Sequence, residues 1–413
     1  MHNITSKILS LSLGLMPIMV LTVKHGVNIS AAIILLTSII VLLIHFPVSM
    51  QLSNKEKVLI IAMLCLPLII LSDVLLRGFR WRYFDYYARF IVVLPIYFAL
   101  RQAKVTIKPF VMGILMGAVA VGLLAVYQCY YIDALNVHGF VIKISFGNIS
   151  LLLGMMSLAS WFLIDSIYYK KIFFISCLLA FFLGLTASIL SGSRGGWVAL
   201  PFFIALFFWY FPIQKLYKLI SVLLLVSILA STYYANDNVK LRVDLVSKEF
   251  NHYFSTDNFG NSEELQVSSV GLRLEVWRAA WLMFTKNPIV GVGSGEFNHT
   301  LQEKIAAGEV ADIFIFDHAH SVPIHLLAIT GVVGFIGYCV LYVGLLYYFY
   351  RSFISSSNNE LQYLSFLGLM LVGASLVFGL TNYSFGHQVN VVFFAVMVVS
   401  LAGMISALEK KQA

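Results

Sequence analysis

Twelve apolar runs, each about as long as a membrane-crossing helix, divide this chain of 413 residues. A spanning helix needs about 20 apolar residues, and lipid offers no partner to backbone N–H and C=O groups, so each run must be helical. Only 11% of the residues are charged, against about 25% in soluble domains. The sequence therefore predicts an all-α polytopic membrane protein with about 12 transmembrane helices, and it excludes a typical cytosolic enzyme. We place the runs at 8–23, 27–46, 57–76, 84–100, 107–131, 144–164, 171–190, 195–211, 214–235, 319–350, 361–380 and 388–408.

One connection is far longer than the others. Residues 236–318 form an 83-residue polar stretch, and loops of this length inside compact proteins are usually functional. The predicted organisation is nine helices in 1–235, the long loop in 236–318, and three helices in 319–413. The loop also contains short helices, because Leu274, Trp277, Trp281 and Phe284 stand at helical spacing. We expect an amphipathic helix over 271–286 that lies on the membrane surface or caps the bundle.

Lysine and arginine set the expected orientation. With the N-terminus inside, the cytoplasmic loops and helix ends hold 13 Lys and Arg, the short loops opposite hold seven, and the long loop holds the remaining seven. Basic residues favour the cytoplasmic side, so both termini are predicted inside and the long loop outside. The loop carries 12 acids and seven bases. The overall charge of +8 therefore reflects topology, and no nucleic-acid partner is expected.

Arg194 is the first candidate functional residue. It lies in Ser-Gly-Ser-Arg-Gly-Gly-Trp at 191–197, between two predicted helices on the outer face. Glycines permit backbone turns and allow a bulky anionic ligand to approach the main chain. The alternative is a membrane-interface arginine that extends to lipid headgroups.

Arg273 is the second candidate. It stands one turn before Trp277 and leans toward the apolar stripe of its predicted helix. A buried arginine needs a partner. The alternatives are a structural salt bridge to one of the loop's acids and an anion clamp shared with Arg194.

His320 is the third candidate, in Asp-His-Ala-His-Ser at 317–321, where the chain enters the tenth predicted helix. Histidine titrates near neutral pH and serves as a general base. The alternatives are a plain interface histidine and a metal ligand together with His318 and His325, but the spacing fits no strong zinc pattern. Pro323 is tolerated in the first turn of that helix.

Arg89 and Asp73 are the clearest charges in or near apolar runs. Such charges are expensive in lipid and often functional, so Arg89 is a weaker third member of the anion site. Arg77, Arg80 and Arg82 with Trp81 are typical of an interfacial anchor. The four cysteines form no CxxC pair, and no P-loop, HExxH, GxSxG or dinucleotide motif is present. We therefore expect no metal and no cofactor.

These residues carry a family resemblance. His320-Ser321, nine residues, Gly331, two residues and Gly334 resemble the H-[NSQ]-x9-G-x-x-G signature of the bacterial O-antigen ligase superfamily. Residues 191–197 resemble its Arg-Gly segment, and Arg273…Trp277…Asn287-Pro288…Gly291-x-Gly293 resembles its large periplasmic loop. Thr330 stands where many relatives carry an acid, so a carboxylate role there is in doubt. The resemblance covers essentially the whole chain.

The resemblance implies a glycosyltransferase of the bacterial inner membrane, with its active site on the periplasmic face. The donor would be a glycan on undecaprenyl pyrophosphate, and the acceptor a sugar hydroxyl of lipid A–core, in lipopolysaccharide biosynthesis. His320, Arg194 and Arg273 would be catalytic, and Arg194, Arg273 and Arg89 would bind the pyrophosphate. Inversion at C1 without a metal or nucleotide is implied by the resemblance alone.

Other functions stay open at this point. An O-antigen polymerase or a protein O-oligosaccharyltransferase would use the same donor, although the short end after the last helix favours ligase or polymerase. A lipid or solute transporter would also suit twelve helices, but it predicts repeats between the halves, and none is evident. A scaffold protein would leave Arg194 and His320 without a role.

Overall fold

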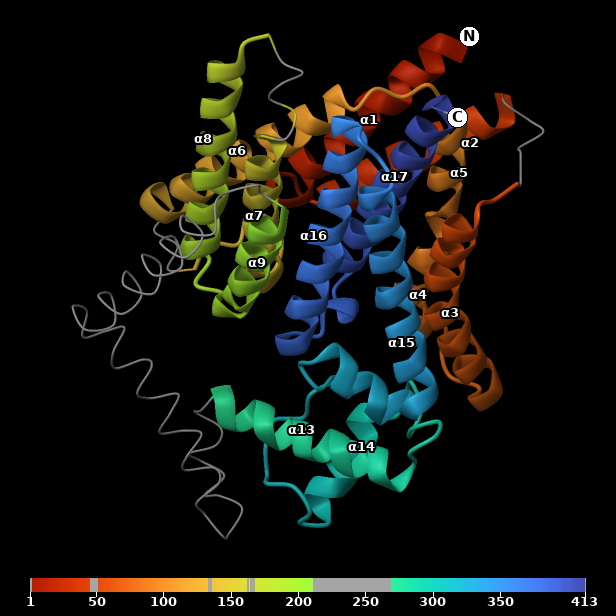
Figure 1. Ribbon diagram of the computed structural model, residues 1–413. Coiled ribbons are helices and arrows are strands. Elements are labelled where there is room, and N and C mark those ends of the chain that lie inside the picture. Colours follow the sequence, from red (N-terminus) through yellow and green to blue (C-terminus); the bar gives the residue numbers. More distant parts are fainter. Residues whose placement is uncertain are drawn as a thin grey trace.

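The computed structural model describes residues 2–44, 51–132, 136–161, 163, 168–210 and 269–412, and these residues are almost entirely helical. Long helices form a bundle, and the helices of the long loop lie at the end opposite the two chain termini (Figure 1). The helices of the first half are α1 (His2–Thr22), α2 (Gly26–Ile44), α3 (Asn54–Arg77), α4 (Arg82–Val92), α5 (Leu94–Gln102), α6 (Lys108–Tyr131), α7 (Lys143–Ala159), α8 (Lys170–Leu190), η2 (Arg194–Ala199) and α9 (Leu200–Tyr210). The second half contains α13 (Ser269–Lys286), α14 (Phe297–Ala306), α15 (Val322–Ile354), α16 (Asn359–Thr381), η3 (Ser384–Gly386) and α17 (Gln388–Gln412).

Nine spans among the described residues are long and apolar enough to cross a membrane, with α4 and α5 counted as the one span Arg82–Gln102. Two shorter apolar helices, Lys143–Ala159 and Gly195–Tyr210, match two further predicted runs. The predicted run at 214–235 lies outside the described residues. The all-α membrane architecture is therefore confirmed, whereas the total of twelve stays a prediction.

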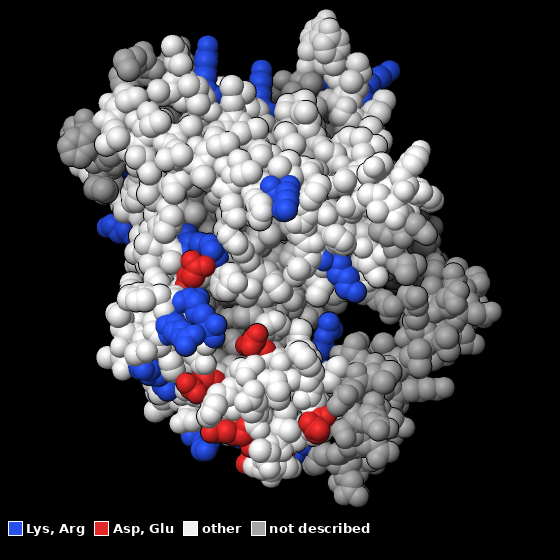
Figure 2. Space-filling model, turned by 180° about the vertical axis from the view of Figure 1, so that it is seen from behind, with Lys and Arg blue, Asp and Glu red and all other residues white. Residues whose placement is uncertain are grey.

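Charged side chains are distributed unevenly between the two ends. Figure 2 shows only basic side chains at the upper rim of that face, whereas acidic side chains appear toward the lower end. At the end with the termini, Arg101 donates from Nε to Glu56 at 2.6 Å, and the Tyr97 hydroxyl donates to the same oxygen at 2.6 Å. Lys55 pairs with Glu409 nearby. Because buried charges must be paired, these contacts tie α3, α5 and α17 together.

α13 caps the bundle, as one of the two alternatives for residues 271–286 predicted, but its buried face differs from the expected stripe. Val276, Ala279 and Met283 are fully buried, whereas Trp281 is 57% exposed. The aromatic residues at helical spacing thus lie partly outside the packed face, because α13 packs on α15 through its small and aliphatic residues.

Candidate functional site

His320 stands where the loop after α14 enters α15. Its φ of +51° lies in the left-handed region, which is uncommon for residues other than glycine. Trp277 of α13 donates from Nε1 to the Ala319 carbonyl at 2.8 Å, and the His320 N–H donates to Nδ1 of His318 at 3.2 Å. Such a conformation persists only where the surroundings enforce it, so α13 and His318 hold His320 in place.

The surroundings keep the His320 ring neutral. Burial, together with the nearby Arg273 guanidinium and His387, lowers its pKa from 6.5 to about 4. A neutral imidazole has one nitrogen free to accept a proton. At pH 7 His320 is therefore able to orient a hydroxyl or to take its proton.

Arg273 places a positive charge beside this neutral base. It is half-buried on α13, and burial lowers its pKa, but arginine stays charged in proteins. The salt bridge to an acid of the loop, which was the alternative, does not occur with any acid that the structure describes. The Arg273 guanidinium is therefore available to an anionic ligand.

Three more side chains with rings, His318, Tyr383 and His387, extend the site around His320. The His318 ring centroid lies 4.4 Å from that of His320, 5.1 Å from that of Tyr383 and 6.2 Å from that of His387. The Tyr383 hydroxyl lies 3.0 Å from that of Tyr87 on α4. Burial lowers the pKa of His318 to about 3 and also lowers that of His387. The cluster is thus a neutral, aromatic wall behind His320.

Sequence reasoning missed His387 and Tyr383, which lie in the connection between α16 and α17. The signal that could have found them is the polar interruption Asn-Tyr-Ser-Phe-Gly-His at 382–387 between two apolar runs. This interruption falls on the same side of the membrane as His320 in any topology where α15, α16 and α17 cross in turn. Its link to His318 is a tertiary contact that no local pattern reveals.

The backbone of Arg194 lies at the end of α8, where Gly192 has a φ of +67° and turns the chain into η2. Thr381, the last residue of α16, donates from Oγ1 to the Gly195 carbonyl at 3.5 Å. A Cβ on Gly196 would lie 2.3 Å from Oδ1 of Asn148 on α7. The Arg194 backbone is therefore packed between α7 and the end of α16, two residues before Tyr383. The Arg194 side chain lies outside the described part of the structure, so its shared anion site with Arg273 stays a prediction.

Arg89 occupies the last turn of α4. It donates from Nη2 to Asp85 at 2.8 Å and lies over the Tyr86 ring. Its Nη1 is buried and has no hydrogen-bond partner among the described residues. Arg89 is thus partly neutralised by Asp85, and its role in anion binding stays a prediction.

Comparison with known protein families finds a match over the part of the chain that contains Arg194, Arg273 and His320. Residues 179–339 match the family model described as O-Antigen ligase. This segment, which is less than half of the chain, is similar to the O-antigen ligase family. The chain is also 22% identical over 401 residues to a protein of Haemophilus influenzae described as uncharacterized, an alignment that covers 94% of this chain and 96% of that protein. The match to the O-antigen ligase superfamily spans residues 191–197, α13 and the start of α15, and it indicates a membrane enzyme of glycan transfer.

The glycines of the O-antigen ligase signature join the loop to the membrane bundle. Gly331 has φ 61° and ψ −154°, which breaks α15, so the predicted continuous helix over 319–350 is wrong at this point. Four backbone hydrogen bonds link 288–293 to 328–333, including Gly293 N–H to the Ile329 carbonyl at 2.8 Å and Val332 N–H to the Pro288 carbonyl at 2.9 Å. A Cβ on Gly331 would lie 2.4 Å from the Ile289 carbonyl. The break exists because two main chains pack directly on each other.

Arg77 and Asp73 clamp the same loop. The Arg77 guanidinium donates to the carbonyls of Val292 at 2.9 Å, Gly291 at 3.1 Å and Val290 at 3.2 Å. Its Nε pairs with Asp73 at 2.8 Å, and Asp73 accepts the Ser294 N–H at 2.8 Å. Arg77 therefore fixes the loop after α13, in place of the lipid anchoring that its sequence surroundings predicted.

Among the described residues, no group of three or more His, Cys, Asp or Glu is arranged to hold a metal ion. Within that part of the chain, the site offers a neutral imidazole, a guanidinium that pairs with no described acid, and a partly buried aromatic wall. These groups suit proton acceptance next to an anion.

Proposed function

We propose that this protein transfers a glycan from undecaprenyl pyrophosphate to a sugar hydroxyl of lipid A–core on the periplasmic face of the bacterial inner membrane. The observation that carries the proposal is the placement of His320 by α13: Trp277 donates to the Ala319 carbonyl at 2.8 Å, and Arg273, one turn earlier on α13, lies within electrostatic reach of the His320 ring and pairs with no acid among the described residues. These residues lie within the segment that matches the O-antigen ligase family. A base and a cation side by side meet the two needs of this reaction, which are an activated hydroxyl and a stabilised anionic leaving group.

The proposed step is a displacement at C1 of the donor sugar. The acceptor oxygen bonds to C1 while the bond from C1 to the phosphate oxygen breaks, and the pyrophosphate leaves with the electron pair. The acceptor proton passes to the free nitrogen of His320. Arg273, Arg194 and Arg89 bind the pyrophosphate, because planar guanidinium groups pair bidentately with phosphate oxygens. The attack takes place on the face opposite the leaving group, so the configuration at C1 is inverted, with no metal, nucleotide or other cofactor.

The packing around these groups supports the chemistry. Preorganised charges act more strongly where water is excluded, and near the base Tyr383 and Tyr87 are buried and His318 is half-buried. The loop helices α13 and α14 would cover the site from the periplasm, and the bilayer would hold the lipid tail of the donor.

A polymerase would use the same groups with a lipid-linked repeat as the acceptor, and a protein O-oligosaccharyltransferase would use a protein hydroxyl. Lipopolysaccharide from a deletion strain separates these functions. Loss of all attached polymer, restored by the wild-type gene, is the expected result for a ligase. A core that carries a single repeat would indicate a polymerase. Unchanged lipopolysaccharide with loss of protein-linked glycan would indicate a protein O-oligosaccharyltransferase.

The same strain tests the site. Arg194→Ala, Arg273→Ala and His320→Ala should leave protein levels normal and abolish attachment. The matched control is His299→Ala, because His299 is a 67% exposed histidine on α14 at the same end of the molecule. Full attachment in all three site variants would overturn the assignment of these residues. Movement of labelled donor across vesicles without bond transfer would favour a transporter.

A further inference from the structure

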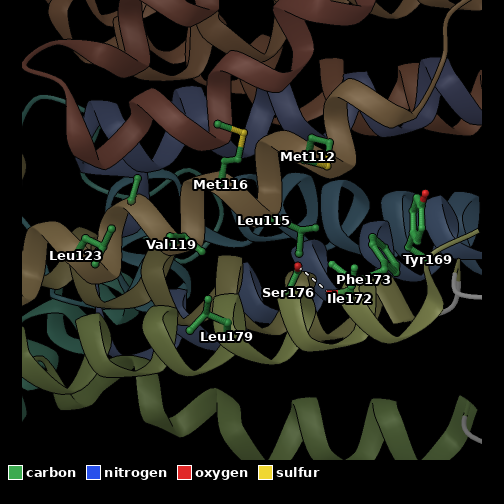
Figure 3. Close-up of a pocket in the computed structure, with 11 residues that line it drawn as sticks. Met112, Leu115, Met116, Val119, Leu123, Tyr169, Ile172, Phe173, Ser176 and Leu179 are labelled. Carbon is green, nitrogen blue, oxygen red and sulfur yellow. Dashed lines mark hydrogen bonds between the residues drawn. The ribbon is translucent and has the colours of Figure 1, made fainter. Parts of the chain in front are cut away.

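An apolar groove lies between α6 and α8, away from His320, and the proposed function does not use it. Residues 112–123 of α6 and 169–179 of α8 line a volume of about 520 Å³. Figure 3 shows Met112, Met116 and Leu123 on one side and Ile172, Phe173 and Leu179 on the other. The Ser176 hydroxyl donates to the Ile172 carbonyl at 2.9 Å, so its polar group is satisfied within its own helix.

The shape of the groove follows from how the two helices pack. At its closed end the helices touch, since a Cβ on Gly122 would lie 2.4 Å from Cβ of Leu183. They separate toward Met112 and Tyr169 (Figure 3). Along α6, residues 112–123 extend about 17 Å at 1.5 Å per residue, which is close to half of a hydrocarbon core of about 30 Å. The groove therefore has the length of one lipid chain in one leaflet.

Basic residues surround the open end. Lys108 precedes Met112 by one helical turn, and Lys104, Lys108 and Lys171 are all exposed. Lys170 is exposed as well, which makes four exposed lysines at this end. An apolar slot as long as one chain, with positive charge at its mouth, is complementary to a lipid whose headgroup is anionic.

We propose that the α6–α8 groove binds an anionic phospholipid from the leaflet at the end of the bundle that carries the chain termini. The acyl chain lies along Met112, Met116 and Phe173, and the headgroup phosphate contacts Lys104 and Lys108. No side chain among the described residues fills this groove, so a lipid chain can occupy it. The site is on the leaflet opposite the His320 site, so it is independent of the proposed transfer reaction.

Native mass spectrometry of the full chain in detergent, with added phosphatidylglycerol or phosphatidylcholine of identical chains, tests the proposal. We expect wild type to retain phosphatidylglycerol preferentially. Lys104→Gln with Lys108→Gln should weaken this retention by about fivefold for each lysine and leave phosphatidylcholine unchanged. The control is Lys57→Gln with Arg351→Gln, which removes the same charge from exposed positions on α3 and α15, across the bundle (Figure 1).

A second variant tests the groove itself. Ala120→Leu adds bulk to the lining and leaves every charge in place, so retention of phosphatidylglycerol should fall while the thermal unfolding temperature holds. Equal retention of both lipids by wild type, or unchanged retention in Ala120→Leu, would overturn the proposal. Tighter retention of a polyprenyl phosphate than of phosphatidylglycerol would also overturn it, because the groove would then bind another lipid. A dimer of the 46.2 kDa chain that dissociates in Ala120→Leu would overturn it as well, because a second copy would then occupy the groove.

Discussion

Gly331→Ala should loosen the joint between the loop and the membrane bundle. The alanine would have to adopt a φ of 61° with a ψ of −154°, a region essentially restricted to glycine, at a cost of about 1–3 kcal/mol. Its Cβ would also lie 2.4 Å from the carbonyl carbon and oxygen of Ile289, so the two main chains must separate. Four hydrogen bonds cross this contact, and at about 1 kcal/mol net each their loss adds about 4 kcal/mol. We expect the free energy of unfolding to fall by about 5–7 kcal/mol in total.

Gly308→Ala is the matched control. Gly308 has a φ of +70°, but a Cβ there would meet nothing within 4 Å, so only the backbone cost of about 1–2 kcal/mol applies. Thermal unfolding of both variants in the same detergent measures the difference, and Gly331→Ala should lower the unfolding temperature at least twice as far. Equal shifts in the two variants would refute the argument that the signature glycine is needed for direct packing of two main chains.

Three further predictions concern the site and its support. The kcat/KM for transfer should stay level from pH 8 to pH 5 and fall only as pH drops toward 4, because the pKa of His320 is held near 4 and the neutral form is the active one; a midpoint near 6.5 would contradict this. Gly196→Ala should impair transfer because its Cβ meets Oδ1 of Asn148 at 2.3 Å, and adding Asn148→Ala should restore activity; no rescue would mean that another contact is responsible. Asp73→Asn should lower the unfolding temperature by more than Asp85→Asn, since Asp73 pairs with Arg77 and accepts the Ser294 N–H of the loop, whereas Asp85 is 61% exposed. Similar shifts in the two variants would contradict the stabilising role of Asp73 at the loop.

Apolar periodicity and length predict the membrane helices well, because the bilayer requires backbone hydrogen bonds to be satisfied within each helix. The break at Gly331 was not predictable in this way. Residues 322–354 form one apolar run, and the break arises from hydrogen bonds to 288–293, which come from a distant part of the chain.

The site was partly predictable for the same reason. His320 and Arg273 stand out in sequence because charged and titratable residues are rare here, and the structure brings them within electrostatic reach of each other. His387 and Tyr383 join the site only through the fold. Arg77 lies in a cluster that is typical of lipid anchoring, and only the tertiary structure reveals its three carbonyl partners.

The most direct test of the account is the rate of glycan transfer by purified protein with a lipid-linked donor and a lipid A–core acceptor. His320→Ala should reduce kcat by about 10²–10⁴-fold, the range for loss of a general base, while His299→Ala on α14 keeps the wild-type rate. Retention of the wild-type rate by His320→Ala would contradict the central claim that the neutral imidazole beside Arg273 activates the acceptor.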